Sequence, residues 1–365
     1  MYESPAGASR LAGVSTAPEL SDYPADNSET GKHMVHDLRS AAIIMRQYGG
    51  PDVLHHEIAS VPALQPDEIR IRSLASAVNH SDLEIRAGNW PILTSAPFPY
   101  TPGLEAVGEV VETGAGVSDI RVSDRVITMM QGLGGVRPQR AGGCAEHVVV
   151  SAGAAAASGS EVDPLDMAAL GLASVTAFEA LHKIGDLEGR RIAVTGAAGG
   201  VGSAAVAIAK AQGAEVIGII SRSEHAHYVR SLGATTTITS QEVAAGVLSP
   251  ETVDGVLDTV GGKSFASYVG ALRTGGTLSL VGAVGGSDVS FDAYRLLEVT
   301  LTGYASDTLN GTALRRAIRF ISEWVSRGVI KAPARTLFPL RDAATAHSKL
   351  EQHLIQGRVL LVPRS

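Results

Sequence analysis

One segment constrains the fold of this chain more than any other, because an apolar run, a glycine-rich turn and a run of small residues follow one another directly. In the pattern G-x-G-x-x-G, Gly199 and Gly202 stand at the second and third glycines, and Ala197 stands at the first. The segment predicts a strand, a loop and a helix whose first amides bind the pyrophosphate of a dinucleotide. A glycine turn that only packs the helix on the strand is the alternative. The three parts are Ile192–Thr195, residues 196–202 and Ser203–Gln212.

The chain that follows this unit repeats the same alternation. Further apolar runs, separated by helical stretches, occur at Glu215–Ile220, Gly255–Asp258 and Thr277–Val281. Strands that alternate with helices pair in parallel and are covered by helices. We therefore predict a Rossmann domain, a doubly wound α/β domain with a parallel sheet, over residues 161–305.

The chain on either side of this domain has a different texture. Short runs of alternating apolar and polar residues are separated by Gly and Pro, which is typical of a small, closed and mostly antiparallel sheet. We expect the later runs to return to the first sheet, so that residues 37–160 and 306–365 form one discontinuous domain. A helix is predicted at Leu314–Arg327, ahead of these later runs. The runs are Ala42–Met45, Glu68–Arg72, Gly108–Glu112, His147–Val150, Ala334–Leu340 and Gly357–Val362.

The first 36 residues show neither the period of a strand nor that of a helix. They are rich in Ser, Ala, Pro, Asp and Glu, and such a segment buries too little apolar surface to fold alone. We expect a disordered leader over residues 1–36.

Composition excludes several classes of function. The formal charge of −7 comes from 37 acidic and 30 basic residues mixed along the chain, so no surface for nucleic acid is expected. The sequence contains no run of about 18 apolar residues, so no membrane association is expected. The single cysteine, Cys144, permits neither an internal disulfide nor a thiolate-rich zinc site, and we expect it to pack in the core. These features favour a cytoplasmic protein.

The choice between NADH and NADPH depends on the end of the second strand of the Rossmann domain. An acidic residue there, about 20 residues after the glycine-rich turn, would bind the ribose 2′-hydroxyl. This strand ends instead in Ile219, Ile220, Ser221 and Arg222. A guanidinium can pair with a 2′-phosphate that a carboxylate would repel. The sequence therefore favours NADPH, unless Arg222 is only a solvated surface residue.

A set of segments in a fixed order extends from about residue 40 to residue 362. They are Tyr48–Leu54, Val78–Asp82, Pro102–Gly108, Ala197–Gly202, Leu257–Gly262, Phe338–Leu340 and Gly357–Leu360. Together they resemble the zinc-independent quinone oxidoreductases of the medium-chain dehydrogenase/reductase superfamily, the group that includes zeta-crystallin. The resemblance implies a GroES-like β-barrel catalytic domain joined to the Rossmann domain, with NADPH bound between them.

The resemblance also implies which residues bind the cofactor. Many relatives have a Lys near the 2′-phosphate where this chain has His225. An imidazole carries less charge than an ammonium group near neutral pH, so the preference for NADPH is expected to be weaker than usual. The implied cofactor residues are Asn79, Thr176, Gly199, Gly200, Val201, Ser221, Arg222, His225, Val260, Gly282, Ala283 and Arg358.

Zinc-dependent members of the superfamily bind a catalytic zinc at three positions and a second zinc in a four-cysteine lobe. The three positions correspond here to Asn79, Leu104 and Leu172. Two leucines cannot bind a metal, and one cysteine cannot build the lobe, so we expect no metal. Without a Lewis acid, an acceptor that spreads the incoming charge over a conjugated system is favoured. The expected substrate is therefore a quinone or an α,β-unsaturated carbonyl.

The family match places Asn79, Asp82 and Trp90 beside the nicotinamide and the acceptor. The Asn79 amide is a candidate donor to the ring or to the substrate oxygen. Its alternative role is a turn before a helix whose N-cap is Ser81 or Asp82. Trp90 stands where quinone reductases often carry Tyr, and an indole stacks on a flat ring but donates no phenolic proton. Solvent would then supply the proton in the reduction of an enone.

Two other functions stay open. An enoyl-thioester reductase would need basic residues for a CoA or carrier phosphate, for which Arg137 and Arg140 are candidates. The second alternative is a crystallin-like protein that binds NADPH without turnover. We expect a homodimer in which the strand Val299–Gly303 pairs with its copy, because an apolar strand at a sheet edge favours pairing.

Overall fold

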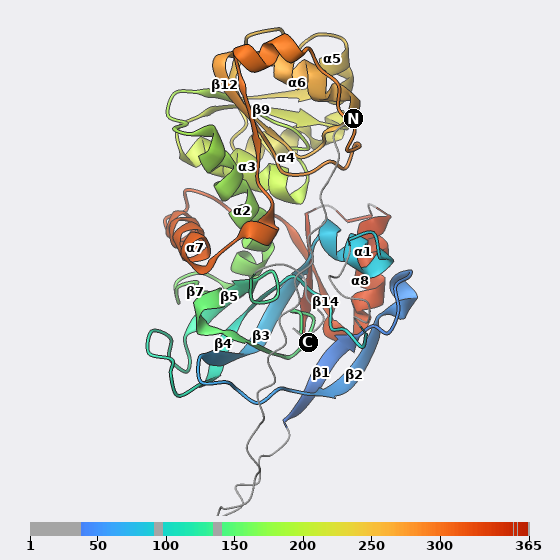
Figure 1. The fold of residues 1–365 in the computed structure, drawn as a ribbon, viewed down its shortest axis with the longest axis vertical. Helices are drawn as coiled ribbons and strands as arrows, with labels where there is room; N and C mark the ends of the chain where they lie inside the picture. The colour runs from blue at the N-terminus through green and yellow to red at the C-terminus, as the bar shows by residue number, and fades with distance from the viewer. Residues whose placement is uncertain (1–37, 91–97, 134–140, 353, 356, 364–365) are drawn as a thin grey trace, which may run out of the picture. The chain divides into compact units, whose positions relative to one another are not determined.

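The structure is a computed structural model, and it describes residues 38–90, 98–133, 141–352, 354–355 and 357–363. The expected leader at 1–36, together with Arg137 and Arg140, lies outside the described residues. Two larger sheets and a two-stranded one make up the described strands (Figure 1).

The first large sheet has six strands, all of them parallel, in the order β10-β9-β8-β11-β12-β13. This order is that of a Rossmann sheet, and the order reverses between β8 and β11. Ile192, Ala193 and Val194 of β8 are wholly buried, as expected for a central strand covered on both faces. The strands are β8 (Arg191–Val194), β9 (Glu215–Ile220), β10 (Thr236–Thr239), β11 (Val253–Asp258), β12 (Leu272–Leu280) and β13 (Thr300–Gly303). The helices between them are α3 (Gly200–Ala211), α4 (Ala226–Ser231), α5 (Ser240–Ala244) and α6 (Phe265–Ala271).

The second large sheet is mostly antiparallel and joins both ends of the described chain. Its order is β14-β15-β3-β4-β5-β7, and β6 also pairs with β3. The late strand β15 lies antiparallel to β3, with Val359 opposite Val78, and Figure 1 shows red and blue segments of the chain side by side. The strands are β3 (Glu68–Val78), β4 (Glu105–Thr113), β5 (Arg125–Met129), β6 (His147–Ser151), β7 (Ala155–Ala157), β14 (Arg335–Pro339) and β15 (Arg358–Val362). A separate antiparallel pair consists of β1 (Arg39–Ile44) and β2 (His55–Ser60).

The remaining helices are α1 (His80–Ala87), α2 (Pro164–Ile184), α7 (Gly311–Ser326) and α8 (Ala343–Glu351). Helix α2 begins after Asp163, whose carboxylate accepts hydrogen bonds from the N–H groups of Leu165 and Asp166. Of the described helices, α2 alone is long and apolar enough to cross a membrane. However, 83% of its most apolar window is buried inside the fold, as in a core helix.

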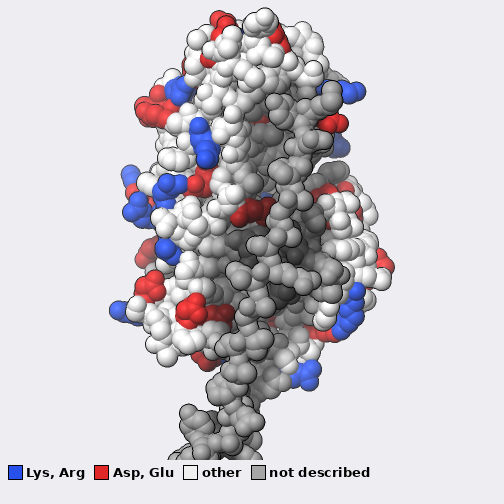
Figure 2. Space-filling view, viewed as in Figure 1, with Lys and Arg blue, Asp and Glu red and all other residues white. Residues whose placement is uncertain are grey.

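The α/β class and the two kinds of sheet that the sequence predicts are confirmed. The proposed domain bounds at 160/161 and 305/306 stay predictions. Helix α3 begins at Gly200 and not at Ser203, so the amides of Gly200 and Val201 belong to its first turn. On the face that Figure 2 shows, acidic and basic residues are interspersed.

Candidate functional site

The glycine-rich turn leaves β8 and leads directly into α3. Gly196 adopts a left-handed backbone with φ of 57°, and a Cβ on Gly202 would lie 2.1 Å from the carbonyl oxygen of Gly196. The third glycine is therefore needed for the close approach of helix and turn. Gly199, in contrast, is exposed. The amides at the start of α3 are thus placed to bind an anion.

Arg358, at the start of β15, lies against this turn. Its side chain is 9% exposed, and a Cβ on Gly200 would lie 2.7 Å from Nη1 of its guanidinium. A larger residue at position 200 would displace the guanidinium from this position. The structure therefore places a buried cation beside the first amides of α3, and such a cradle fits a pyrophosphate.

Asn79 directly follows β3 and is the N-cap of α1. The expectation that Ser81 or Asp82 is the N-cap is wrong, because the helix begins at His80 and Asp82 is its third residue. The side chain of Asp82 accepts hydrogen bonds from the backbone N–H groups of Asn79 (2.8 Å) and Leu104 (3.1 Å). Asp82 therefore fixes the backbone at Asn79 and at the residue before β4.

The side chain of Asn79 joins two charged residues. Its Nδ2 donates to Oε1 of Glu105 at 2.8 Å, and its Oδ1 accepts from Nη2 of Arg358 at 2.8 Å. The Glu105 and Arg358 side chains approach to 3.6 Å. We call Asn79, Glu105 and Arg358 the buried triad. Both the nitrogen and the oxygen of the Asn79 amide are thus hydrogen-bonded inside the protein. The sequence predicts that the same amide donates to the nicotinamide or to the substrate oxygen.

Two carboxyl groups are strongly desolvated here, that of Glu105 in the triad and that of Asp82 beside it. Burial raises the pKa of Asp82 to about 7, against the hydrogen bonds from Asn79 and Leu104, and the nearby Glu105 adds to the rise. Burial also raises the pKa of Glu105, while Arg358 and the hydrogen bonds from Asn79 and Leu172 oppose this rise. Perturbed carboxyl groups of this kind cluster at functional sites.

The carboxyl ends of β8 and β11 are joined by a second buried network. The hydroxyl of Thr195 donates to Asp258 at 2.6 Å, and Asp258 also accepts from the N–H groups of Val260 (2.9 Å) and Gly261 (3.2 Å). Thr195 in turn accepts from the N–H of Thr259 at 2.8 Å. The network lies where the strand order reverses, which is the place where Rossmann sheets bind ligands. It holds the backbone of the predicted cofactor residue Val260.

The loop that follows the next strand, β12, lies beside Val260. The N–H of Gly285 donates to the Val260 carbonyl at 2.7 Å. Two predicted cofactor residues, Gly282 and Ala283, line a hollow of about 580 Å³ at the carboxyl ends of β12 and β13. Val260, Gly282 and Ala283 therefore lie together at the carboxyl ends of the strands.

Ser221 and Arg222 follow β9, and His225 ends the short 3-10 helix Ser223–His225. Nη1 of Arg222 lies 3.5 Å from Glu224, and Nε2 of His225 lies 3.8 Å from the same carboxylate. Arg222 is largely exposed, with a side-chain exposure of 64%. A ligand phosphate would therefore compete with Glu224 for both side chains.

The two remaining predicted residues, Thr176 and Trp90, lie outside the Rossmann strands and their loops. Thr176 is buried on α2, and Trp90 packs as a half-buried side chain against the main core cluster. The structure thus joins Asn79, Gly200 and Arg358 by contact. It places Ser221, Arg222, Val260 and Gly282 after the carboxyl ends of β9, β11 and β12.

The comparisons with known proteins agree with this architecture. Two family models match the chain, the alcohol dehydrogenase GroES-like domain over residues 65–158 and the zinc-binding dehydrogenase over residues 200–323. The chloroplastic NADPH-dependent alkenal/one oxidoreductase of Arabidopsis thaliana is 31% identical over 327 residues, which cover 88% of this chain and 79% of that protein. The chain belongs to the medium-chain dehydrogenase/reductase superfamily.

Other members of the superfamily are similar over nearly their whole length. The 2-haloacrylate reductase of a Burkholderia species is 28% identical over 340 residues, which cover 89% of this chain and 99% of that protein. The crystal structure of Escherichia coli quinone oxidoreductase complexed with NADPH superposes with a TM-score of 0.76 at 26% identity. This match covers 89% of this chain and 100% of that one.

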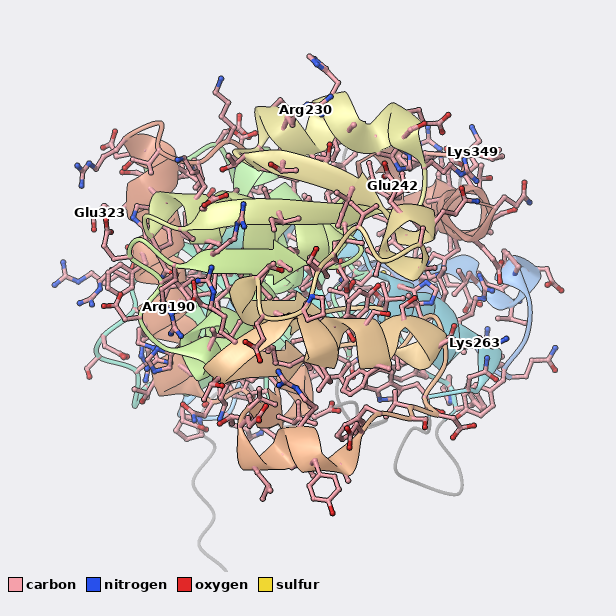
Figure 3. All side chains as sticks on the ribbon, turned by 90° about the horizontal axis from the view of Figure 1, so that it is seen from above. Arg190, Arg230, Glu242, Lys263, Glu323 and Lys349 are labelled. Atoms are coloured by element: carbon pink, nitrogen blue, oxygen red, sulfur yellow. The ribbon has the colours of Figure 1, made fainter. Side chains whose placement is uncertain are left out.

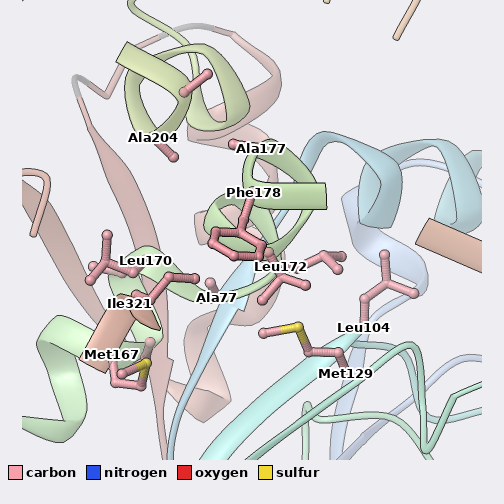
Figure 4. Packing of buried hydrophobic residues seen from close by; sticks show 14 of the residues in the cluster. Ala77, Leu104, Met129, Met167, Leu170, Leu172, Ala177, Phe178, Ala204 and Ile321 are labelled. Carbon is pink, nitrogen blue, oxygen red and sulfur yellow. The ribbon is translucent and has the colours of Figure 1, made fainter. Parts of the chain in front are cut away.

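Two of the three positions that the resemblance matches to the ligands of a catalytic zinc are apolar in this chain. Leu104 and Leu172 are 2% and 5% exposed and belong to the main core cluster, in which Met129 and Phe178 also lie (Figure 4). Among the residues that the structure describes, no group of three or more His, Cys, Asp or Glu is placed to hold a metal. Cys144 is buried in the same cluster, which confirms the packing role expected for it.

Sequence analysis missed three polar residues of this site. Glu105 lies inside a matching segment but was assigned no role, and Thr195 and Asp258 form their network only in the folded sheet. No spacing or periodicity distinguishes a buried carboxylate from a surface one. For Glu105 and Asp258, the available signal was an acidic residue at the border of an apolar strand.

Proposed function

We propose that this chain is a zinc-independent, NADPH-dependent oxidoreductase that transfers hydride to a quinone or an α,β-unsaturated carbonyl. The observation that carries the proposal is the pair of buried leucines, Leu104 and Leu172, at two of the three zinc positions. They lie in a superfamily member whose glycine-rich turn and Arg358 form a cradle for a dinucleotide. The alkenal/one and quinone oxidoreductases among its relatives support the same substrate class.

The donor set of the cradle fits NADPH. The amides of Gly200 and Val201 and the guanidinium of Arg358 would hold the pyrophosphate. Gly199, whose own N–H donates to the carbonyl of Gly196 at 2.8 Å, would let the backbone approach it. Ser221, Arg222 and His225 would bind the 2′-phosphate. Thr176, Val260, Gly282 and Ala283 would line the nicotinamide side. When bound, NADPH supplies the hydride, and the protein supplies orientation and electrostatics.

A protein without a Lewis acid must stabilise the charge that develops on the acceptor by hydrogen bonds and by the acceptor's own conjugation. Trp90 can stack on a flat acceptor ring. Because an indole is a poor proton donor, solvent completes the reduction of an enone. We also propose that the protein acts in the cytoplasm, where its single thiol stays reduced.

A substrate panel with both coenzymes tests the proposal. We expect steady oxidation of NADPH with 1,4-benzoquinone, 9,10-phenanthrenequinone or a short enone, and slower oxidation of NADH. Binding of NADPH without turnover of any acceptor would favour the crystallin-like alternative. Turnover confined to enoyl thioesters would favour the enoyl-thioester reductase. Brisk NADP-dependent oxidation of ethanol or benzyl alcohol would refute the assignment.

A further inference from the structure

Helix α2 is broken in its middle, and the buried triad holds both sides of the break. Gly171 has φ of 41° and ψ of −144°, outside the helical region. On the far side of the break, the N–H of Leu172 donates to Oε2 of Glu105 at 2.6 Å. On the near side, the carbonyl of Ala169 accepts from Nε of Arg358 at 3.1 Å. Two side chains from the second large sheet therefore bond the backbone groups on either side of the break.

The break leaves just enough space for the carboxylate. A Cβ on Gly171 would lie 2.0 Å from Oε2 of Glu105, and the positive φ also disfavours any other residue. The Glu105 side chain is 1% exposed. A carboxylate this deeply buried is tolerated when its oxygens are bonded and a cation lies beside it, and here Asn79, Leu172 and Arg358 fulfil both conditions.

Glu105 is connected to two separate parts of the proposed cofactor site. Through Asn79 and the facing guanidinium it orients Arg358, whose Nη1 lies beside Gly200. Through Leu172 it caps the second half of α2, which carries Thr176 one turn later. The residues after β9 that would bind the adenosine 2′-phosphate have no bond to this network among the described contacts.

We propose that Glu105 is a positioning residue that aligns the pyrophosphate and nicotinamide sides of the cofactor site, and not its adenosine side. The proposal rests on the proposed function, since it presumes that the chain binds NADPH. It predicts that loss of the carboxylate weakens the whole dinucleotide but not its adenosine fragment. A residue that only stabilised the fold would weaken both ligands alike.

The test compares two ligands by calorimetric titration, NADPH and adenosine 2′-monophosphate. For Glu105→Gln, we expect the Kd of NADPH to rise about 10- to 100-fold, because the amide cannot accept from both Asn79 and Leu172. The Kd of adenosine 2′-monophosphate should change less than about threefold. Equal losses for the two ligands, or an unchanged Kd of NADPH, would overturn the proposal.

A second carboxylate on α2 provides a matched control. Glu179 is 7% exposed and accepts two hydrogen bonds of 2.8 Å from Arg316, outside the triad. Glu179→Gln should lower the melting temperature and leave both Kd values within about threefold of the wild type. If this control lost NADPH selectively as well, the effect would belong to α2 as a whole and not to Glu105.

A second variant and the wild-type protein distinguish the remaining outcomes. If Glu105→Gln does not fold, Glu105→Asp replaces it under the same criteria, because the shorter side chain keeps the charge but cannot reach both partners. Wild-type protein that binds neither ligand would refute the proposed function itself. Wild-type protein that binds NADPH, with variants that bind it equally well, would refute only the role of Glu105.

Discussion

The guanidinium of Arg358 donates a hydrogen bond of 2.8 Å to the amide oxygen of Asn79, a residue 279 positions earlier in the chain. The pairing of β15 with β3 brings the two residues together. The bond connects the cation beside the glycine-rich turn to the residue that the family match places at the nicotinamide. Cofactor binding and acceptor reduction are therefore expected to respond together to changes in this pair.

Replacement of Asn79 tests whether its amide acts on the substrate or on the triad. For Asn79→Ala we expect quinone turnover to fall about 10- to 1000-fold, as for the loss of one preorganised donor. The affinity for NADPH should fall as well, because Arg358 loses its acceptor. Steady-state kinetics and NADPH titration measure the two effects, with the exposed Asn89→Ala as control. Unchanged turnover would remove Asn79 from the mechanism.

Arg222 is expected to discriminate between the coenzymes. Arg222→Glu should weaken NADPH far more than NADH, since it places a carboxylate where the 2′-phosphate binds. The matched control is Arg230→Glu on the exposed side chain of α4 that Figure 3 labels. The guanidinium of Arg230 donates to the hydroxyl of Thr237. Titration of each variant with both coenzymes gives the ratio. An equal loss for NADH and NADPH would show that Arg222 is not the discriminator.

Purified protein is expected to contain no stoichiometric zinc. Leu104 and Leu172 cannot bind a metal, and a site made by Asn79 alone would be too weak to retain one. Elemental analysis after dialysis is the measurement, and quinone turnover should be insensitive to a chelator. About one zinc per chain, bound through His or carboxylate groups, would reopen the alcohol dehydrogenase interpretation.

The Rossmann sheet is expected to pair with its copy through β13, which the structure places at the sheet edge. Tyr294 and Leu297, on the 3-10 helix Ala293–Leu297 just before this strand, are 77% and 83% exposed. Such an apolar surface favours association. We expect light scattering to show a dimer for the wild type and a monomer for Leu297→Asp. The exposed Val247→Asp serves as control and should leave the dimer intact.

The acid stability of the protein is expected to depend on His347. Burial, and secondarily Arg86, lower the pKa of His347 from its ordinary 6.5 to about 3. Because the unfolded chain takes up a proton more readily, His347 contributes stability above pH 6.5 that is lost as the pH falls towards 3. The loss should be on the order of 4 kcal/mol. Denaturant unfolding across this range should show a shallower dependence for His347→Gln, and no change of slope for the exposed His56→Gln.

The sequence by itself determined the local units of this protein. The apolar run Glu215–Ile220 coincides with β9 residue for residue, and the glycine spacing at 196–202 identifies the turn before α3. Such units are encoded locally, because glycines permit a positive φ and a short apolar run is typical of a strand buried on both faces. The motifs also located the candidate cofactor residues along the chain.

Tertiary structure alone decided how those residues connect. Glu105 bonds Asn79 and Leu172, which lie 26 and 67 positions away, and no periodicity encodes such distances. The break of α2 at Gly171 cannot be predicted from the helical pattern around it either. It depends on the carboxylate of Glu105, which packs against the break from β4. The physical reason is that a buried polar group is stable only with its partners in place, and packing of distant elements supplies those partners.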